Sequence, residues 1–309
     1  MSDAPDLGIF LPTMTSPGRP VPDVARAARH AEELGFESVW VVDQLVAGTG
    51  APFVESTVAL ALAAGVTDRV KLGLGVAIVP LRPVVWLAKQ AASLQLVSGG
   101  RLVLGVGVGG DRHDRSWTAA GVPATQRGAR TDAALEVLPG LIAGEAVTVP
   151  SLPGSPIVQL APGADVPPIV VGGMSGAAIR RAVAMGGGWL LLPGAPATVA
   201  EARAQLEAAA ARAGRPVPPI TASLLGVVTD DPALPSRPQI TAALTDPDGM
   251  FGMPPEAVDA LLTAGDRDAI AGLLAEYGRV GASRVVVSVA SGDWFRQAEL
   301  IAQARERAG

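Results

Sequence analysis

The chain of 309 residues contains no cysteine, only two histidines and a single tyrosine. The absence of cysteine excludes disulfide bonds, thiolate nucleophiles and zinc sites with cysteine ligands. Because His30 and His113 are the only histidines, a metal site built from several imidazoles is not expected either. We therefore predict that the protein holds no metal.

Long apolar runs and concentrated charge are also missing. The nearest candidate for a membrane span, residues 54–66, is interrupted by Glu55 and is too short. No basic segment followed by an apolar one opens the sequence, so we expect a cytoplasmic protein that has no signal peptide and does not bind membranes. The net charge of −5 is spread along the chain without a basic stripe, which argues against a nucleic acid partner.

Apolar and small residues are abundant: 49% of the residues are hydrophobic and 37 are glycine. This composition supports a large core and argues against disorder. Short apolar runs of strand length alternate with segments that have helical spacing. The predicted strands cover residues 7–11, 38–42, 70–76, 102–106, 168–173, 188–192, 220–228 and 283–289.

Eight strands that are each followed by a helix predict an α/β protein, a (β/α)8 TIM barrel that forms a single domain over residues 1–309. Two proline-rich excursions interrupt the alternation, at residues 144–166 after the fourth helix and at residues 230–255 after the seventh strand. A further helical segment is predicted at residues 256–264. A doubly wound sheet is the competing fold, but it usually carries a glycine fingerprint after its first strand, and this sequence has none there.

The sequence is organised around a glycine-rich element that ends the fourth predicted strand. Gly105, Gly107, Gly109 and Gly110 follow a buried apolar run there. In a barrel, ligands bind where the strands end. Glycine at such positions lets a flat ring or a phosphate approach the backbone closely. For any single glycine, the alternative explanation is a tight turn that needs a positive φ.

A second glycine-rich stretch follows the fifth strand and leads into a helix. It would present backbone N–H groups and a hydroxyl at the N-terminus of that helix, an arrangement that binds anions. We favour a phosphate site over a bare turn, with Gly173 and Ser175 as its main contacts. The stretch consists of Gly172, Gly173, Met174, Ser175 and Gly176.

Other strand ends carry single candidates. Asp43, followed by Gln44, would accept a hydrogen bond from a ligand N–H, or else cap a turn. Gly75 and Val76 are small and apolar, which suits packing against a planar ring, or else belongs to the barrel core. His113 is a possible proton donor, with a solvated loop histidine as the alternative.

Several segments together resemble the bacterial luciferase-like family of flavin and deazaflavin oxidoreductases. The resemblance implies a (β/α)8 barrel that binds a flavin-type ring at the carboxyl ends of its strands and the phosphate at residues 172–176. It also implies a cis peptide bond between Gly75 and Val76 that supports the ring, which Asp43 would orient. The segments that carry it are residues 34–43, 68–73, 98–107, 127–130, 167–173 and 188–190.

The sequence departs from the family pattern at three places. Gln44 stands where many members have a histidine near the reacting ring atoms, and an amide donates a hydrogen bond but is not a general acid near neutral pH. Gly110 stands where the sugar-phosphate dehydrogenase branch has a glutamate. Gly187 stands where an aspartate is common.

Within this family the sequence resembles the deazaflavin-dependent branch. The resemblance implies a reductase that uses the deazaflavin coenzyme F420 to deliver a hydride to an activated C=C or C=N bond of a small molecule or a modified peptide. Gln44 and His113 are the candidate catalytic residues, and water is the alternative proton source. The candidate cofactor contacts are Asp43, Gly75, Val76, Gly107 and residues 172–176.

Two other functions stay open. One is an FMN-dependent monooxygenase that uses O₂ and a partner flavin reductase. The other is a non-catalytic paralogue that binds a cofactor or a partner. Because family members commonly form dimers, a homodimer is expected.

Overall fold

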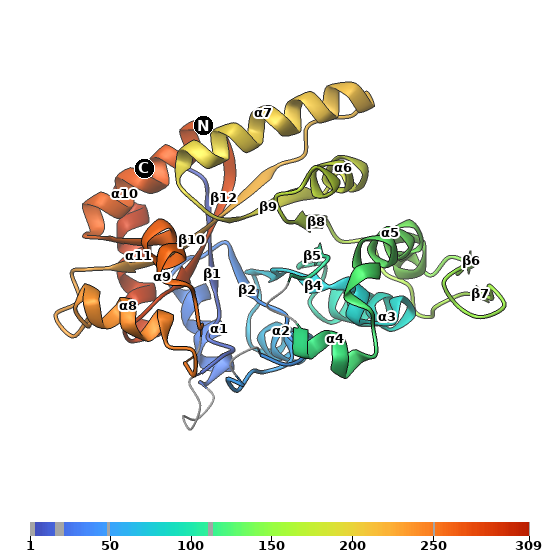
Figure 1. The fold of residues 1–309 in the computed structure, drawn as a ribbon, viewed down its shortest axis with the longest axis horizontal. Helices are drawn as coiled ribbons and strands as arrows, with labels where there is room; N and C mark the ends of the chain where they lie inside the picture. Colours follow the sequence, from blue (N-terminus) through green and yellow to red (C-terminus); the bar gives the residue numbers. More distant parts are fainter. Residues whose placement is uncertain (1–3, 16–21, 48–49, 111–113, 250, 309) are drawn as a thin grey trace.

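The computed structural model describes residues 4–15, 22–47, 50–110, 114–249 and 251–308. Within them, eight parallel strands close a barrel, and helices surround it (Figure 1). This confirms the predicted TIM-barrel fold. The barrel strands are β1 (Asp6–Phe10), β2 (Ser38–Val41), β3 (Lys71–Leu74), β5 (Leu102–Gly107), β8 (Ile169–Gly172), β9 (Gly188–Pro193), β10 (Ile220–Val228) and β12 (Ala282–Val289). The surrounding helices are α1 (Val24–Glu33), α2 (Ser56–Val66), α3 (Val84–Val97), α5 (Arg127–Ala143), α6 (Gly176–Met185), α7 (Pro196–Ala213), α10 (Arg267–Arg279) and α11 (Trp294–Ala308).

A tryptophan fills the interior of the barrel. Trp40 of β2 is fully buried and clusters with Val103, Val170 and other apolar side chains from facing strands. Its indole Nε1 donates a hydrogen bond to Ser38 Oγ at 2.8 Å. A Cβ on Gly73 of the neighbouring β3 would clash with the indole ring. Glycine in the third strand therefore makes room for the largest side chain of the core.

An ion-pair cluster ties the last strand to the start of the second and third. Arg284 donates to the two carboxylate oxygens of Glu37 at 2.8 and 2.7 Å, and Lys71 lies 2.6 Å from the same group. Burial alone would raise the pKa of Glu37, but Arg284, and after it Lys71 and Ser38, lower this pKa to about 2. The carboxylate thus stays charged where the barrel closes.

The first excursion, after α5, contains a small antiparallel hairpin of β6 (Val147–Thr148) and β7 (Ile157–Val158). Figure 1 shows this hairpin projecting from the barrel beyond α5. Between β5 and α5 lie α4 (Asp114–Ala120) and a 3-10 turn, η3 (Ala124–Gln126).

The second excursion, after β10, is more ordered than predicted. It contains α8 (Arg237–Thr245), whose N-terminus is closed by a capping box between Ser236 and Gln239. The predicted helix over residues 256–264 is partly wrong, because α9 (Pro255–Leu261) is followed by a strand, β11 (Leu262–Gly265). This strand pairs with Leu225–Val228, the end of β10 that extends beyond its pairing with β9. A free strand edge needs a partner, and tertiary pairing here overrides the local pattern.

Among the described residues, no helix is long and apolar enough to cross a bilayer.

Replacing Glu37 with glutamine should lower the free energy of unfolding at pH 7 and flatten its dependence on pH in acid. The folded pKa of about 2 lies below the ordinary 4.5. The stabilisation is therefore complete above that ordinary value and is lost as the pH falls towards 2. It amounts to on the order of 3 kcal/mol. Urea unfolding at a series of pH values measures it.

The matched control is Glu207→Gln, which removes an exposed carboxylate that pairs with Arg203 on the same helix. This control should change the free energy of unfolding by less than about 1 kcal/mol. An unchanged acid dependence in Glu37→Gln would contradict the assignment.

Candidate functional site

The third barrel strand breaks at its carboxyl end. The Gly75–Val76 peptide bond is cis, as the resemblance implied. The chain then continues as β4 (Ala77–Ile78), which pairs with the end of β5, and as a 3-10 turn, η1 (Val79–Leu81). The Val76 side chain packs against the interior cluster around Trp40. The break therefore directs one valine side chain across the mouth of the barrel.

Glycines of two neighbouring strands make room for this valine. A Cβ on Gly107 would lie 2.5 Å from Val76 Cγ2, and a Cβ on Gly172 would lie 2.8 Å from Val76 Cγ1. A Cβ on Gly105 would clash with the Leu74 carbonyl. The broken strand and its valine therefore occupy the space beside Gly105, Gly107 and Gly172. Contact of Gly107 with a cofactor stays a prediction.

Asp43, the predicted orienting residue, is buried and bonded within the protein. Its Oδ2 accepts a hydrogen bond from the Ile78 N–H at 2.8 Å. Its Oδ1 accepts from the Ser56 hydroxyl at 2.9 Å and from Arg82 Nη2 at 2.6 Å. The carboxylate thus holds the segment that follows Val76. Contact between Asp43 and a ligand ring stays a prediction.

Arg82 bridges two carboxylates, since its Nη2 also donates to Glu55 at 2.9 Å. Burial would lower the pKa of Arg82, but its hydrogen bonds to Asp43 and Glu55 raise it. Burial would likewise raise the pKa of Glu55, and Thr57, the Val58 N–H and Arg82 lower it. Arg82 and Glu55 therefore stay charged and paired. Together with Asp43 they join the ends of β2 and β3 to the start of α2.

The stretch predicted to bind an anion lies where β8 leads into α6. Ser175 caps the helix by accepting the Ala178 N–H at 3.2 Å, which leaves the hydroxyl proton free to donate. Gly173 has a φ of +115°, and its carbonyl accepts from the Trp189 indole at 2.7 Å. The first N–H groups of a helix have no partner within it and attract anions. Met174, Ser175 and Gly176 are exposed, so this cradle faces solvent.

Arg180 is absent from the predicted site residues, yet its side chain lies beside the start of α6. A Cβ on Gly176 would lie 3.9 Å from Arg180 Nη1, so the guanidinium turns back towards the start of α6. Residues four apart share one helix face, and this spacing is the sequence signal that points to Arg180. The departure at Gly187 is steric, because a Cβ there would clash with the backbone of Ile169.

The candidate hydrogen-bond donors differ in how they are placed. Gln44 is half-buried at the end of the second strand, and His113 lies outside the described residues. A donor not predicted is Trp117 of α4: its side chain is 4% exposed, and its Nε1 has no hydrogen-bond partner among the described residues. The ring packs on Ile78, and a Cβ on Gly109 would meet it at 2.9 Å. A buried N–H without a partner is unusual in proteins.

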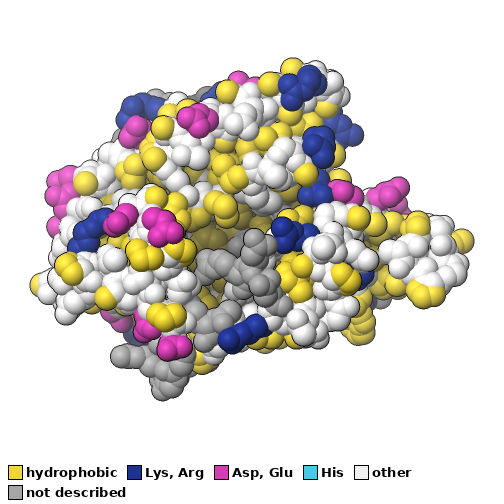
Figure 2. Space-filling view, viewed as in Figure 1, with side chains coloured by type: hydrophobic (Ala, Val, Ile, Leu, Met, Phe, Trp, Pro, Cys, Tyr) yellow, Lys and Arg dark blue, Asp and Glu magenta, His cyan; other side chains and the backbone are white. Residues whose placement is uncertain are grey.

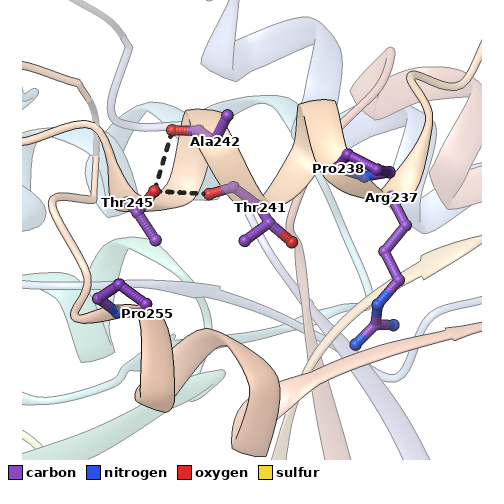
Figure 3. Close-up of a pocket in the computed structure, with 6 residues that line it drawn as sticks. All are labelled: Arg237, Pro238, Thr241, Ala242, Thr245 and Pro255. Atoms are coloured by element: carbon purple, nitrogen blue, oxygen red, sulfur yellow. Dashed lines mark hydrogen bonds between the residues drawn. The ribbon is translucent and has the colours of Figure 1, made fainter.

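The excursion after β10 carries a cavity of its own. Its volume is about 520 Å³, and it lies between α8 and the start of α9 (Figure 3). Arg237 is its ionisable side chain, and the Thr245 hydroxyl is occupied by the carbonyls of Thr241 and Ala242 at 3.0 and 3.3 Å. None of the predicted site residues lines it. Figure 2 shows that the adjoining face is hollowed near its middle, where hydrophobic side chains lie at depth.

No group of three or more metal-binding side chains occurs in the described part of the chain.

The sequence matches a family model described as luciferase-like monooxygenase over residues 6–235. An uncharacterised protein of Mycobacterium tuberculosis is 36% identical over 143 residues, which are 46% of this chain and 49% of that protein. The 5,10-methylenetetrahydromethanopterin reductase of Methanolobus tindarius is 34% identical over 133 residues, which are 43% of this chain and 38% of that enzyme. The matched segment spans about half of these relatives or less.

Solved structures match almost the whole chain. An F420-dependent secondary alcohol dehydrogenase, solved with an F420–acetone adduct, has a TM-score of 0.81 at 17% identity and covers 99% of both chains. The oxygenating constituent of 3,6-diketocamphane monooxygenase from Pseudomonas putida, solved with FMN, has a TM-score of 0.71 at 16% identity and covers 97% of both chains. At such identities the similarity establishes the fold.

Gly107→Ala should lower the free energy of unfolding by about 1–3 kcal/mol, because the new methyl group meets Val76. Adding Val76→Ala should recover most of this loss, so that the two substitutions are not additive. Gly110→Ala is the control, since a Cβ there has nothing within 4 Å. Denaturant unfolding of the parent, the single variants and the double variant measures the coupling. Simple additivity would contradict the role given to Gly107.

Proposed function

The chain belongs to the luciferase-like monooxygenase family, whose model matches residues 6–235, and from this premise we propose that it is a reductase dependent on coenzyme F420. Membership makes it an oxidoreductase of the luciferase-like kind. The proposed reaction transfers a hydride to an activated C=C or C=N bond of a small molecule or a modified peptide. A proton must follow to complete the reduction.

The observation that most supports this proposal is that Val76, which could support a ring, lies next to the start of the proposed anion cradle. Val76 packs where a Cβ of Gly172 would stand, and the next residue, Gly173, opens the cradle that Ser175 caps. A tricyclic ring that carries a phosphate on a short chain requires these two features side by side.

The residues present fit such a cofactor in the following roles. When bound in its reduced form, F420 supplies the hydride. Val76 would support the ring, while Ser175 and Arg180 would hold the phosphate together with the first N–H groups of α6. Gln44 and Trp117 would donate hydrogen bonds but no proton near neutral pH. The proton would come from His113 or from water.

Coenzyme F420 and FMN are both found among the structural neighbours. We favour F420 because the resemblance in sequence is to the deazaflavin branch and because the F420-dependent alcohol dehydrogenase matches with the higher TM-score of the two. The FMN-bound 3,6-diketocamphane monooxygenase supports the alternative, a monooxygenase that depends on reduced FMN and O₂.

Titration of the purified protein with F420 and with FMN tests the proposal. F420 should bind at least about tenfold more tightly than FMN, which corresponds to about 1.4 kcal/mol. Tight binding of FMN without binding of F420 would overturn it. Oxygen consumption with reduced FMN would then support the monooxygenase.

Ser175→Ala tests the cradle in the same titration. Removing one hydroxyl donor should weaken F420 binding by about 3- to 10-fold and leave the affinity for the phosphate-free deazariboflavin fragment unchanged. Ser93→Ala is the control, because this exposed hydroxyl bonds only its own helix, at the Lys89 carbonyl. An equal loss with the fragment would show that Ser175 acts through the fold alone.

A further inference from the structure

A groove lined by three arginines lies between α6 and α7. Its volume is about 710 Å³. Its ionisable side chains are Arg180 of α6, Arg212 of α7 and Arg215, which follows α7; the other lining residues are uncharged, and half of them are alanine. Figure 2 shows basic side chains gathered over α6 and the C-terminal end of α7. In a chain of net charge −5, this is a local concentration of positive charge.

The protein leaves two of these charges unneutralised. Among the described residues, the side chains of Arg180 and Arg212 make no hydrogen bond or ion pair with another protein group. Arg180 interacts electrostatically with Asp132, but the Asp132 carboxylate already accepts a hydrogen bond from Arg181 at 2.6 Å. Arg215 donates to the Ala184 carbonyl at 2.6 Å and so links the end of α7 to α6. Like charges along one groove repel each other unless an anion lies between them.

The groove begins at the phosphate cradle. Gly176, the first residue of α6, lines it, and the Arg180 guanidinium turns back to this end. Gly176, Arg180 and Ala184 recur every four residues and thus lie on one face of α6. From Gly176 to Ala184 the helix rises about 12 Å. A chain that leaves the cradle can therefore follow the helix past Arg180 towards Arg212.

We propose that this groove binds the oligo-γ-glutamate tail of coenzyme F420, an inference that rests on the proposed function. The tail continues beyond the phosphate and carries one carboxylate per residue, whereas FMN ends at its phosphate. Arg180 binds the phosphate end, and Arg212 and Arg215 bind carboxylates further along. The small side chains that line the groove let the tail approach both helices.

The test compares F420 that carries several glutamates with the phosphate-bearing form that carries none. At low ionic strength, the parent protein should bind the long-tailed form about fivefold more tightly, as expected for a few exposed charge pairs. Arg212→Gln should reduce this ratio to about one, and added salt should do the same in the parent. Arg203→Gln on the same helix is the matched control, because Arg203 does not line the groove. Both arginines are exposed, so both variants should fold.

Equal affinities of the parent for the two forms would overturn the inference, and so would an equal loss in Arg203→Gln. Free tetra-γ-glutamate, measured on the same three proteins, separates this failure from that of the proposed function. Binding of the peptide to the parent but not to Arg212→Gln, with no binding of either F420 form, would overturn the coenzyme and leave an oligo-γ-carboxylate site. Failure of the peptide and of both F420 forms would overturn both assignments.

Discussion

The packing of Val76 against Gly107 and Gly172 is the contact on which the site depends. Three barrel strands end at this point, and a side chain on either glycine would displace the valine. Protein interiors tolerate little change of volume, so the glycines and the valine specify each other. Asp43 completes the unit by accepting the Ile78 N–H, which holds the chain just after the valine. Strand break, glycine pattern and buried carboxylate are thus one structural device.

Charges are used in two different ways around this device. The buried Asp43 carboxylate is paired with Arg82, because an unpaired charge in the interior would be strongly destabilising, and Arg82 also reaches the exposed carboxylate of Glu55. Arg180 and Arg212 instead face solvent without partners among the described residues. Paired charges shape the mouth of the barrel, and unpaired ones line the route that leads away from the cradle. This division fits a site that holds an apolar ring inside and an anionic chain outside.

Local sequence patterns were sufficient to predict the barrel and the start of α6 at Ser175. Hydrophobic periodicity predicts strands and helices, and the helix start at Ser175 depends only on residues that are adjacent in the chain. The patterns were insufficient where a distant partner decides. Leu262–Gly265 is a strand because β10 offers a free edge. Trp117 is buried because its indole packs beside Ile78. Neither partner is near in sequence.

Patterns within the chain were enough to predict the alternation of eight strands and helices, the glycine-rich strand ends and, through the family resemblance, the cis bond at Gly75–Val76. The contacts that these features make could be found only in the folded protein. Gly107 makes room for Val76, Asp43 is held by Arg82, and the Arg180 guanidinium turns back to the start of α6. The physical reason is that periodicity and turn chemistry act between neighbours in the chain, whereas packing and charge pairing act between residues that only the closed barrel brings together.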